Sequence, residues 1–128
     1  MTPIALGTGL TAASVSAGGL HVCAVLSNKQ LKCWGFNSGV LGLGDAANRG
    51  DGLGEMGDAL RAVSLGNGRT VSSVSAGFFH TCAILDNGGV KCWGSNGSGE
   101  LGYGDTRMRG ATASDMGDNL PYVDLGHE

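Results

Sequence analysis

The sequence predicts an all-β protein made of two four-stranded antiparallel units that follow one another along the chain. Three observations support this prediction: a long internal repeat, short apolar runs separated by turn residues, and almost no helical periodicity. The chain has 128 residues, and 25 of them are glycine, which suits a fold with many tight turns. Repeated units of this kind bury their apolar faces against neighbours, so neither unit is expected to be complete alone.

The repeat is seen in motifs that recur about 60 residues apart. Ser-Val-Ser-Ala-Gly occurs at 14–18 and again at 73–77, and Lys-Cys-Trp-Gly follows it in both copies. One residue is inserted after Asn96, so equivalent positions differ by 59 before it and by 60 after it. The chain therefore divides into an overlap segment, a first repeat and a second repeat, at residues 1–13, 14–72 and 73–128.

Four short strands are expected in each repeat, because short apolar runs alternate with turn residues. The expected strands, given as pairs from the two repeats, are 13–17 and 72–76, 21–26 and 80–85, 31–34 and 90–93, and Ala62–Leu65 and Tyr122–Leu125. The second hairpin turns at Asp86-Asn-Gly88, where Gly88 supplies the positive φ. Lys29 stands at the equivalent position, so the first turn is expected to be strained or of another type.

The hairpins also determine where the four cysteines lie. The expected register places Cys23 opposite Cys33 and Cys82 opposite Cys92. Directly opposed residues on antiparallel strands are close enough for a disulfide, so two bridges are predicted. Reduced structural thiols and a zinc site are the alternatives, although zinc sites usually use shorter cysteine spacings. A disulfide implies an oxidising compartment, so the prediction is an extracellular or cell-surface protein.

Several motifs also resemble a known family. The segments His-x-Cys-Ala-x-Leu, Lys-Cys-Trp-Gly-x-Asn and Leu-Gly-x-Gly-Asp, which occur in both repeats, resemble the regulator-of-chromosome-condensation (RCC1-like) repeat over nearly the whole chain. The resemblance implies two four-stranded antiparallel blades of a β-propeller, incomplete without further blades or copies. The added cysteine pair in each repeat resembles an extracellular branch of the family. The nucleotide-exchange activity of the nuclear member is not carried over to this chain.

The two ends of the chain fall at nearly the same phase of the repeat. Ala5-Leu-Gly-Thr-Gly9 resembles Ser64-Leu-Gly-Asn-Gly68, and the chain closes on Asp124-Leu-Gly126. The first residues lack the pattern of a signal peptide. This favours an excerpt of a longer repeat array. A closed ring of copies, or an open filament of copies joined head to tail, are the alternatives.

Composition excludes several kinds of function. The net charge is −3 and the basic residues are scattered, whereas a nucleic-acid binder has a clustered basic face. No apolar stretch is long enough for a membrane helix, so membrane insertion is not expected. No catalytic constellation, cofactor motif or metal-ligand spacing stands out. The prediction is therefore a protein without enzymatic activity, cofactor or metal.

Other candidate residues are given structural roles. His21, Trp34, His80 and Trp93 are expected to pack within or between blades. Polar loops are expected to be held by ion pairs, with a calcium site as the alternative. The residues assigned to these ion pairs are Asp45, Arg49, Asp58, Asp105, Arg109 and Asp118. Asn96-Gly-Ser is an N-glycosylation motif, so Asn96 is a candidate acceptor.

The sequence thus favours a non-catalytic extracellular repeat module that acts as a protein-binding scaffold. The alternative is a structural subunit that joins with its own copies into a ring or filament, and guanine-nucleotide exchange ranks third. The expected partner is another protein or further copies of the chain.

Overall fold

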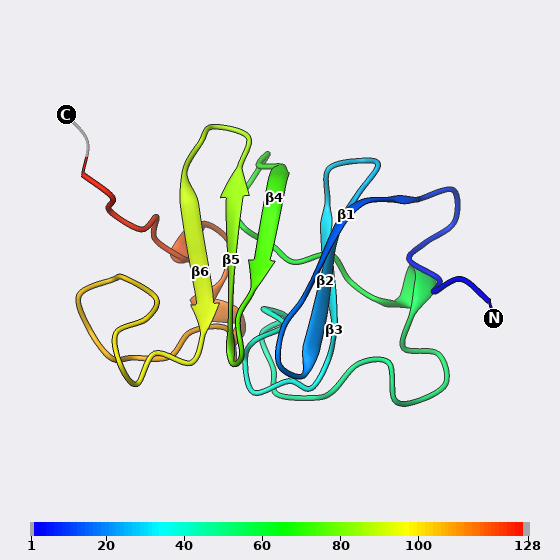
Figure 1. Cartoon of the computed structure of the whole chain (residues 1–128), viewed down its shortest axis with the longest axis horizontal. Helices are drawn as coiled ribbons and strands as arrows, with labels where there is room; N and C mark the ends of the chain where they lie inside the picture. The colour runs from blue at the N-terminus through cyan, green and yellow to red at the C-terminus, as the bar shows by residue number, and fades with distance from the viewer. Residues whose placement is uncertain (1, 127–128) are drawn as a thin grey trace.

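A computed structural model describes residues 2–126 and shows two antiparallel sheets lying side by side, with the two chain ends on opposite sides (Figure 1). In chain order the elements are β1 (Ala12–Ala17), β2 (His21–Leu26), β3 (Leu31–Gly35), the 3₁₀ helix η1 (Gly57–Ala59), β4 (Val71–Ala76), β5 (His80–Leu85), β6 (Val90–Gly94), and the 3₁₀ helices η2 (Ala113–Asp115) and η3 (Gly117–Asn119). The overlap residues 1, 127 and 128 lie outside the described part. No helix within residues 2–126 is long and apolar enough to cross a membrane.

Each sheet is a simple meander, with strand orders β1-β2-β3 and β4-β5-β6. The register places Cys23 opposite Cys33 and Cys82 opposite Cys92, and both pairs are disulfides. Their Cα atoms lie 4.1 Å apart in each case. The predicted pairing of the cysteines is confirmed, and each bridge joins the two strands of one hairpin rather than the two sheets.

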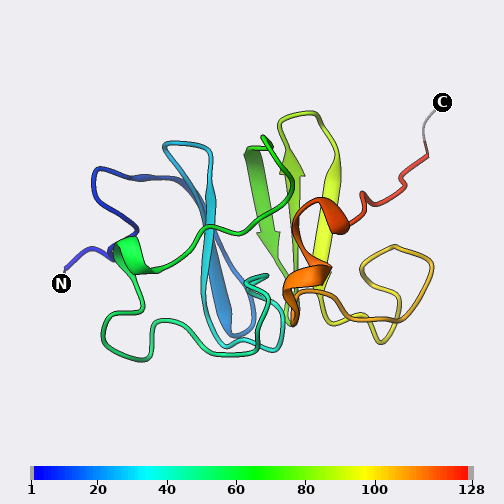
Figure 2. The ribbon, with the colours of Figure 1, turned by 180° about the vertical axis from the view of Figure 1, so that it is seen from behind.

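The predicted fourth strands are not formed, and each sheet has three strands in the described chain. The two segments only touch the edges of the sheets. Val63 donates one backbone hydrogen bond to Leu31 O, and Val123 donates one to Val90 O, both at 2.8 Å. The first segment then leaves the edge, because Leu65 O accepts a hydrogen bond from Lys91 Nζ near the other sheet. Figure 2 shows this connection passing from one sheet to the next.

Both hairpin turns have the same backbone shape in spite of their different residues. Gly88 has φ 82° and Lys29 has φ 70°, and Lys29 is the one non-glycine residue with positive φ in residues 2–126. The strain predicted for the first turn is therefore present, without a change of turn. A left-handed conformation costs a side-chain-bearing residue about 1–2 kcal/mol.

The core is shared between the two sheets. Leu31 and Val40 from the first repeat and Leu85 and Trp93 from the second belong to one cluster of buried side chains. At one end the sheets approach so closely that a Cβ at Gly18 would overlap the carbonyl oxygen of Gly77. This close approach leaves no room for a side chain at Gly18, the residue that follows β1.

Replacing Lys29 by glycine is expected to stabilise the protein by about 1 kcal/mol, because the strain is relieved at an exposed site. The matched change Gly88→Ala is expected to destabilise it by a similar amount, since open space surrounds Gly88 and only the backbone is affected. Urea unfolding of the three chains measures both effects. Equal midpoints for K29G and the wild type would contradict the assignment of strain.

Removing either disulfide by a pair of Cys→Ala substitutions is expected to lower the free energy of unfolding by roughly 2–3 kcal/mol, because each bridge closes a loop of sequence separation 10. The intact protein is expected to gain four hydrogens in mass on full reduction. Urea unfolding measures the first effect and mass spectrometry the second. An unchanged mass after reduction under denaturing conditions would show that the bridges are not formed.

Candidate blade junction and protein-interaction surface

The contact between the two sheets is organised around one backbone atom, the carbonyl oxygen of Val40. Thr81 Oγ1 donates a hydrogen bond to it at 2.7 Å, and Trp93 Nε1 donates a second at 2.9 Å. His21 Nε2 lies 2.9 Å from Thr81 Oγ1. Thr81 and Trp93 are fully buried and His21 nearly so. This group of four residues is called the junction network, and it joins the loop after β3 to strands of both sheets.

The junction network determines the protonation of His21. Thr81 gives its only hydroxyl proton to Val40 O, so it accepts from His21, and Nε2 must carry the imidazole proton. His21 Nδ1 is buried and has no hydrogen-bond partner. Burial therefore lowers the pKa of His21, and the nearby His80 lowers it further. The neutral ring is the form that fits the folded protein.

Backbone contacts extend the junction along the inner strands. Ala76 N donates to Ser16 Oγ at 2.9 Å, and Gly19 N donates to Gly77 O at 3.2 Å. Both bonds cross from one sheet to the other. The serines of the repeated Ser-Val-Ser-Ala-Gly motif are therefore not only strand residues, because one of them links neighbouring sheets.

Two buried lysines, which the sequence analysis did not single out, tie the connecting segments to the sheets. Lys91 Nζ donates to Leu65 O at 2.8 Å and to Gly117 O at 3.2 Å, and it lies over the ring of Tyr122. Lys32 makes the equivalent bonds to Leu6 O and Gly57 O. Burial lowers the pKa of Lys91. The signal was present in the sequence, since a lysine recurs at an apolar strand position of both repeats.

The polar loop of each repeat is held by an arginine–aspartate pair. Arg49 Nη2 lies 2.8 Å from Asp45 Oδ2, and Arg109 Nη2 lies 2.9 Å from Asp105 Oδ2. The hydrogen bond from Arg109 lowers the pKa of Asp105 to about 2. The Arg109 guanidinium also stacks on the Tyr103 ring, 4.3 Å from its centre. In the described chain no group of three or more acidic, His or Cys side chains is arranged to hold a metal ion.

Asp58 and Asp118 were assigned to the same ion pairs, and this assignment is wrong. Asp58 accepts hydrogen bonds from the backbone N and hydroxyl of Thr8, at 2.8 and 2.6 Å. Asp118 accepts one from Asn67 N at 2.9 Å. These aspartates lie within the 3₁₀ helices η1 and η3, and they fasten the connecting segments and not the polar loops.

Asn96 does not present its side chain as a glycosylation acceptor would. It is 1% exposed, and Nδ2 donates to Asp105 O, to Asp105 Oδ1 and to Arg107 O. Asn37 makes the same set of bonds in the first repeat. In the folded chain the nitrogen that would carry the sugar therefore shapes the loop, and glycosylation of Asn96 stays a prediction.

The four residues expected to pack between blades separate into two pairs. His21 and Trp93 lie in the junction network, while their equivalents His80 and Trp34 lie on faces that no other sheet covers within residues 2–126. Trp34 lines a hollow of about 500 Å³ together with apolar residues such as Val22 and Ile4. Each sheet therefore has one covered face and one open face.

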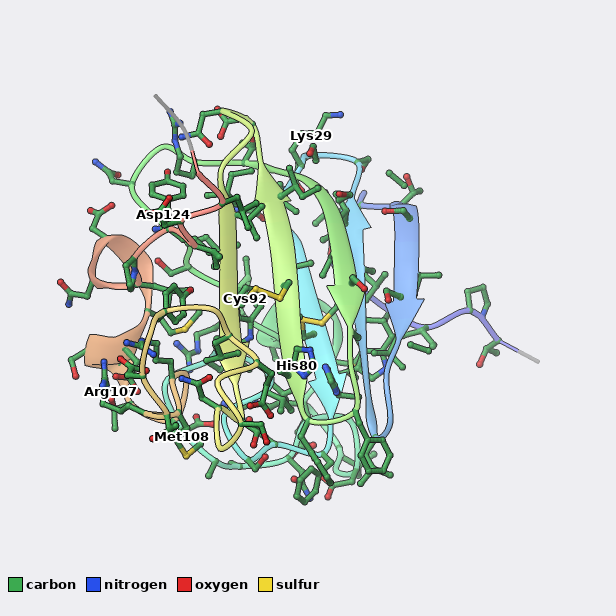
Figure 3. All side chains as sticks on the ribbon, turned by 60° about the vertical axis from the view of Figure 1, so that its left-hand side comes forward. Lys29, His80, Cys92, Arg107, Met108 and Asp124 are labelled. Atoms are coloured by element: carbon green, nitrogen blue, oxygen red, sulfur yellow. A yellow bond between two sulfur atoms is a disulfide. The ribbon has the colours of Figure 1, made fainter. Side chains whose placement is uncertain are left out.

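Three phenylalanines and a methionine gather at one end of the junction, and the sequence analysis missed them. Phe36, Phe78, Phe79 and Met108 are 40%, 63%, 38% and 41% exposed. The ring centres of Phe78 and Phe79 are 4.5 Å apart, and those of Phe36 and Phe79 are 6.4 Å apart. Figure 3 shows Met108 near this lower end of the sheets. These four residues are called the aromatic patch.

The signal for the aromatic patch was a departure from the repeat. The equivalent positions in the other repeat hold Ser95, Gly19, Leu20 and Asn48. All three phenylalanines of the chain are therefore at positions where the two repeats differ. Residues that serve the shared fold recur, whereas a surface that spans both blades has no reason to do so.

The comparisons with known proteins agree with this geometry. The model of the regulator of chromosome condensation (RCC1) repeat matches residues 12–39 and 71–100, which contain all six strands. The chain belongs to the RCC1-like repeat family. Its sheets are RCC1-like blades, and the disulfide in each hairpin agrees with a cysteine-paired branch of the family.

Two curated relatives of these RCC1 repeats come from Arabidopsis thaliana. The RCC1 domain-containing protein RUG3, mitochondrial, is 35% identical over 95 residues, which is 74% of this chain and 20% of the relative. The ultraviolet-B receptor UVR8 is 31% identical over 110 residues, which is 84% of this chain and 23% of the relative. The chain spans about a fifth to a quarter of the length of these relatives.

A solved structure shows the same arrangement of RCC1 blades. The crystal structure of Kap60 bound to yeast RCC1 (Prp20) matches with a TM-score of 0.64 and 19% identity, over 94% of this chain and 26% of that chain. The likeness at this identity shows the fold alone: two neighbouring blades of an RCC1 propeller.

Acid is expected to destabilise the RCC1 blade pair through His21. Its pKa is lowered in the folded state from 6.5, so the unfolded chain binds more protons below that pH. The contribution of His21 to the free energy of unfolding should be constant well above pH 6.5 and fall by up to about 1.4 kcal/mol per unit as the pH drops below it. Urea unfolding at pH 7.5 and 5.5 measures this loss.

His21→Gln should remove this dependence, and His80→Gln is the matched control in the open blade face. The loss between pH 7.5 and 5.5 is expected to persist in H80Q and to disappear in H21Q. An equal loss in both variants would mean that another group causes the effect.

Proposed function

We propose that the chain is a protein-binding module of an extracellular RCC1-like propeller and that it acts without catalysis. Its binding surface is the aromatic patch. The observation that carries the proposal is the exposure of Phe36, Phe78, Phe79 and Met108 in one continuous group at the end of the blade junction.

The composition of the patch favours a protein partner. Aromatic residues and methionine are enriched in protein interfaces, and exposed clusters of them are uncommon elsewhere on soluble proteins. Phe36, Phe79 and Met108 line a shallow hollow of about 380 Å³, and its other lining residues, Ser38 and Ser95, are small and uncharged. The patch therefore suits an apolar side chain from a partner, held by ring contacts and not by ion pairs.

The position of the patch supports a scaffold role. Phe36 follows β3 of the first blade, and Phe78 and Phe79 lie between β4 and β5 of the second, so the surface exists only when both blades are docked. The two disulfides support an extracellular setting, because such bridges persist in oxidising compartments. Yeast RCC1, whose blades share this fold, is seen bound to a protein, Kap60.

The proposal is tested by cross-linking and binding with patch variants. Phe78→Ser and Phe79→Ser are each expected to weaken binding of the partner at least about tenfold, as central aromatic residues do in protein interfaces. Leu53→Ser is the matched control, since Leu53 is fully exposed and lies outside the patch. Partners are identified by mass spectrometry after cross-linking from a residue introduced at Ser38, and their affinities are then measured with purified proteins. Equal affinity for wild type, F78S and F79S would overturn the proposal.

The alternative function, head-to-tail joining of copies, would use the open blade faces and leave the aromatic patch free. Head-to-tail joining therefore requires that the open face of the first blade fit the open face of the second blade of another copy.

A further inference from the structure

We infer that the open face of the second blade takes a further RCC1-like repeat of different sequence, and not a second copy of this chain. This repeat carries Thr or Ser at the position of Thr81 and no acidic residue at the position of Ala111. The inference rests on the blade fold and the junction network, and it is independent of the aromatic patch. The open face consists of His80, Cys82 and Ile84 of β5 with Val90 of β6, and Figure 3 turns this side of the molecule forward.

The junction between the two blades shows what such a face requires. The covered face of the first blade presents His21 and the carbonyl of Val40, and both bind the hydroxyl of Thr81 from the second blade. The loop on both sides of Val40 also touches the second blade closely. A Cβ at Gly39 would lie 3.3 Å from Ala111 N, and one at Gly44 would lie 2.9 Å from Ala113 Cα.

The open face of the second blade has the same parts with one change. His80 is equivalent to His21, and Gly99 and Gly104 are equivalent to Gly39 and Gly44. Glu100 stands in place of Val40, so its carbonyl can serve the same bonds while its carboxylate adds a negative charge. A repeat that covers this face must therefore supply a hydroxyl for His80 and must not place an acid near Glu100, because a buried unpaired group or a like-charge pair is costly.

A second copy of the chain fails both requirements. Its open face presents Val22 where the internal junction has Thr81, so His80 would be covered without a partner for its ring nitrogen. It presents Asp51 where the junction has Ala111, against the loop that carries Glu100. It also presents Leu53 at the position of Ala113. In the internal junction Ala113 lies so close to Gly44 that little space is left for a larger side chain.

The overlap segment gives an independent reason. Leu6 O accepts a bond from Lys32 as Leu65 O does from Lys91, and Thr8 N donates to Asp58 as Asn67 N does to Asp118. Residues 6–8 thus fill, against the first blade, the place that residues 65–67 fill against the second. If two copies joined head to tail, the segment after Val123 of one copy would need the place that residues 6–8 of the other copy already fill.

The test extends the full chain after Glu128 by a copy of residues 69–128, so that a third blade follows in phase. Three versions are compared: one with the copied Thr81 unchanged, one with Val at that position, and one with Asp at the position copied from Ala111. Thr81→Val in the original two-repeat chain calibrates the loss of the hydroxyl at a junction that is already formed. Thermal unfolding and the slowly exchanging ring N–H of His80, seen by NMR, are the readouts.

The chain with the unchanged copy is expected to unfold about 3–6 °C above the Val and Asp versions and to show a protected His80 ring proton that the Val version lacks. The two-repeat chain is expected to sediment as a monomer. Equal midpoints for all three versions would overturn the inference, as would oligomers of the two-repeat chain that His80→Ala disrupts. None of these measurements uses the aromatic patch, so either result leaves the proposed binding function unaffected.

Discussion

The two blades depend on the carbonyl oxygen of Val40, which accepts hydrogen bonds from Thr81 and Trp93 in a dry interior. Buried hydrogen bonds of this kind are costly to leave unmade, so the contact specifies one orientation of the sheets. The acceptor is a backbone atom, so a residue of another type at this position still offers the same carbonyl. The Val40 side chain is buried in the shared core, whereas its equivalent Glu100 is exposed on the face of the second blade that no other sheet covers.

Four of the basic residues fasten loops and connecting segments within this protein. Arg49 and Arg109 close the polar loops on aspartates, and Lys32 and Lys91 hold connecting segments through backbone carbonyls. The charged groups of these four side chains therefore bind other groups of the protein, although such side chains often face solvent in other proteins. The end of the junction is left apolar, with the aromatic patch as its main exposed feature.

The elements predicted correctly from the sequence are those that depend on neighbouring residues. The hairpin register, the pairing of Cys82 with Cys92 and the strain at Lys29 all follow from the short turns of the two hairpins. The fourth strand at Ala62–Leu65 and the role of Asp58 were mispredicted, and the loop-shaping bonds of Asn96 were not foreseen. Asp58 is bound by Thr8, far away in the sequence, and the strand is diverted by Lys91. Such contacts join segments that are far apart in the sequence, so patterns among neighbouring residues do not predict them.

The aromatic patch was missed for a related reason. Repetition directs attention to what the two copies share, and Phe78 and Phe79 stand where they differ. Their significance appears only when docking brings them beside Phe36 from the other blade.

The bond between Lys91 and Leu65 O means that the second blade is held in part by residues that precede it in the sequence. A piece excised at the apparent start of the second repeat, Ser73, would leave the ammonium group of Lys91 with one of its two carbonyl acceptors missing inside an apolar interior. Excision a few residues before Leu65 would keep that acceptor. The segment that folds together therefore begins before the repeat as the sequence motifs define it.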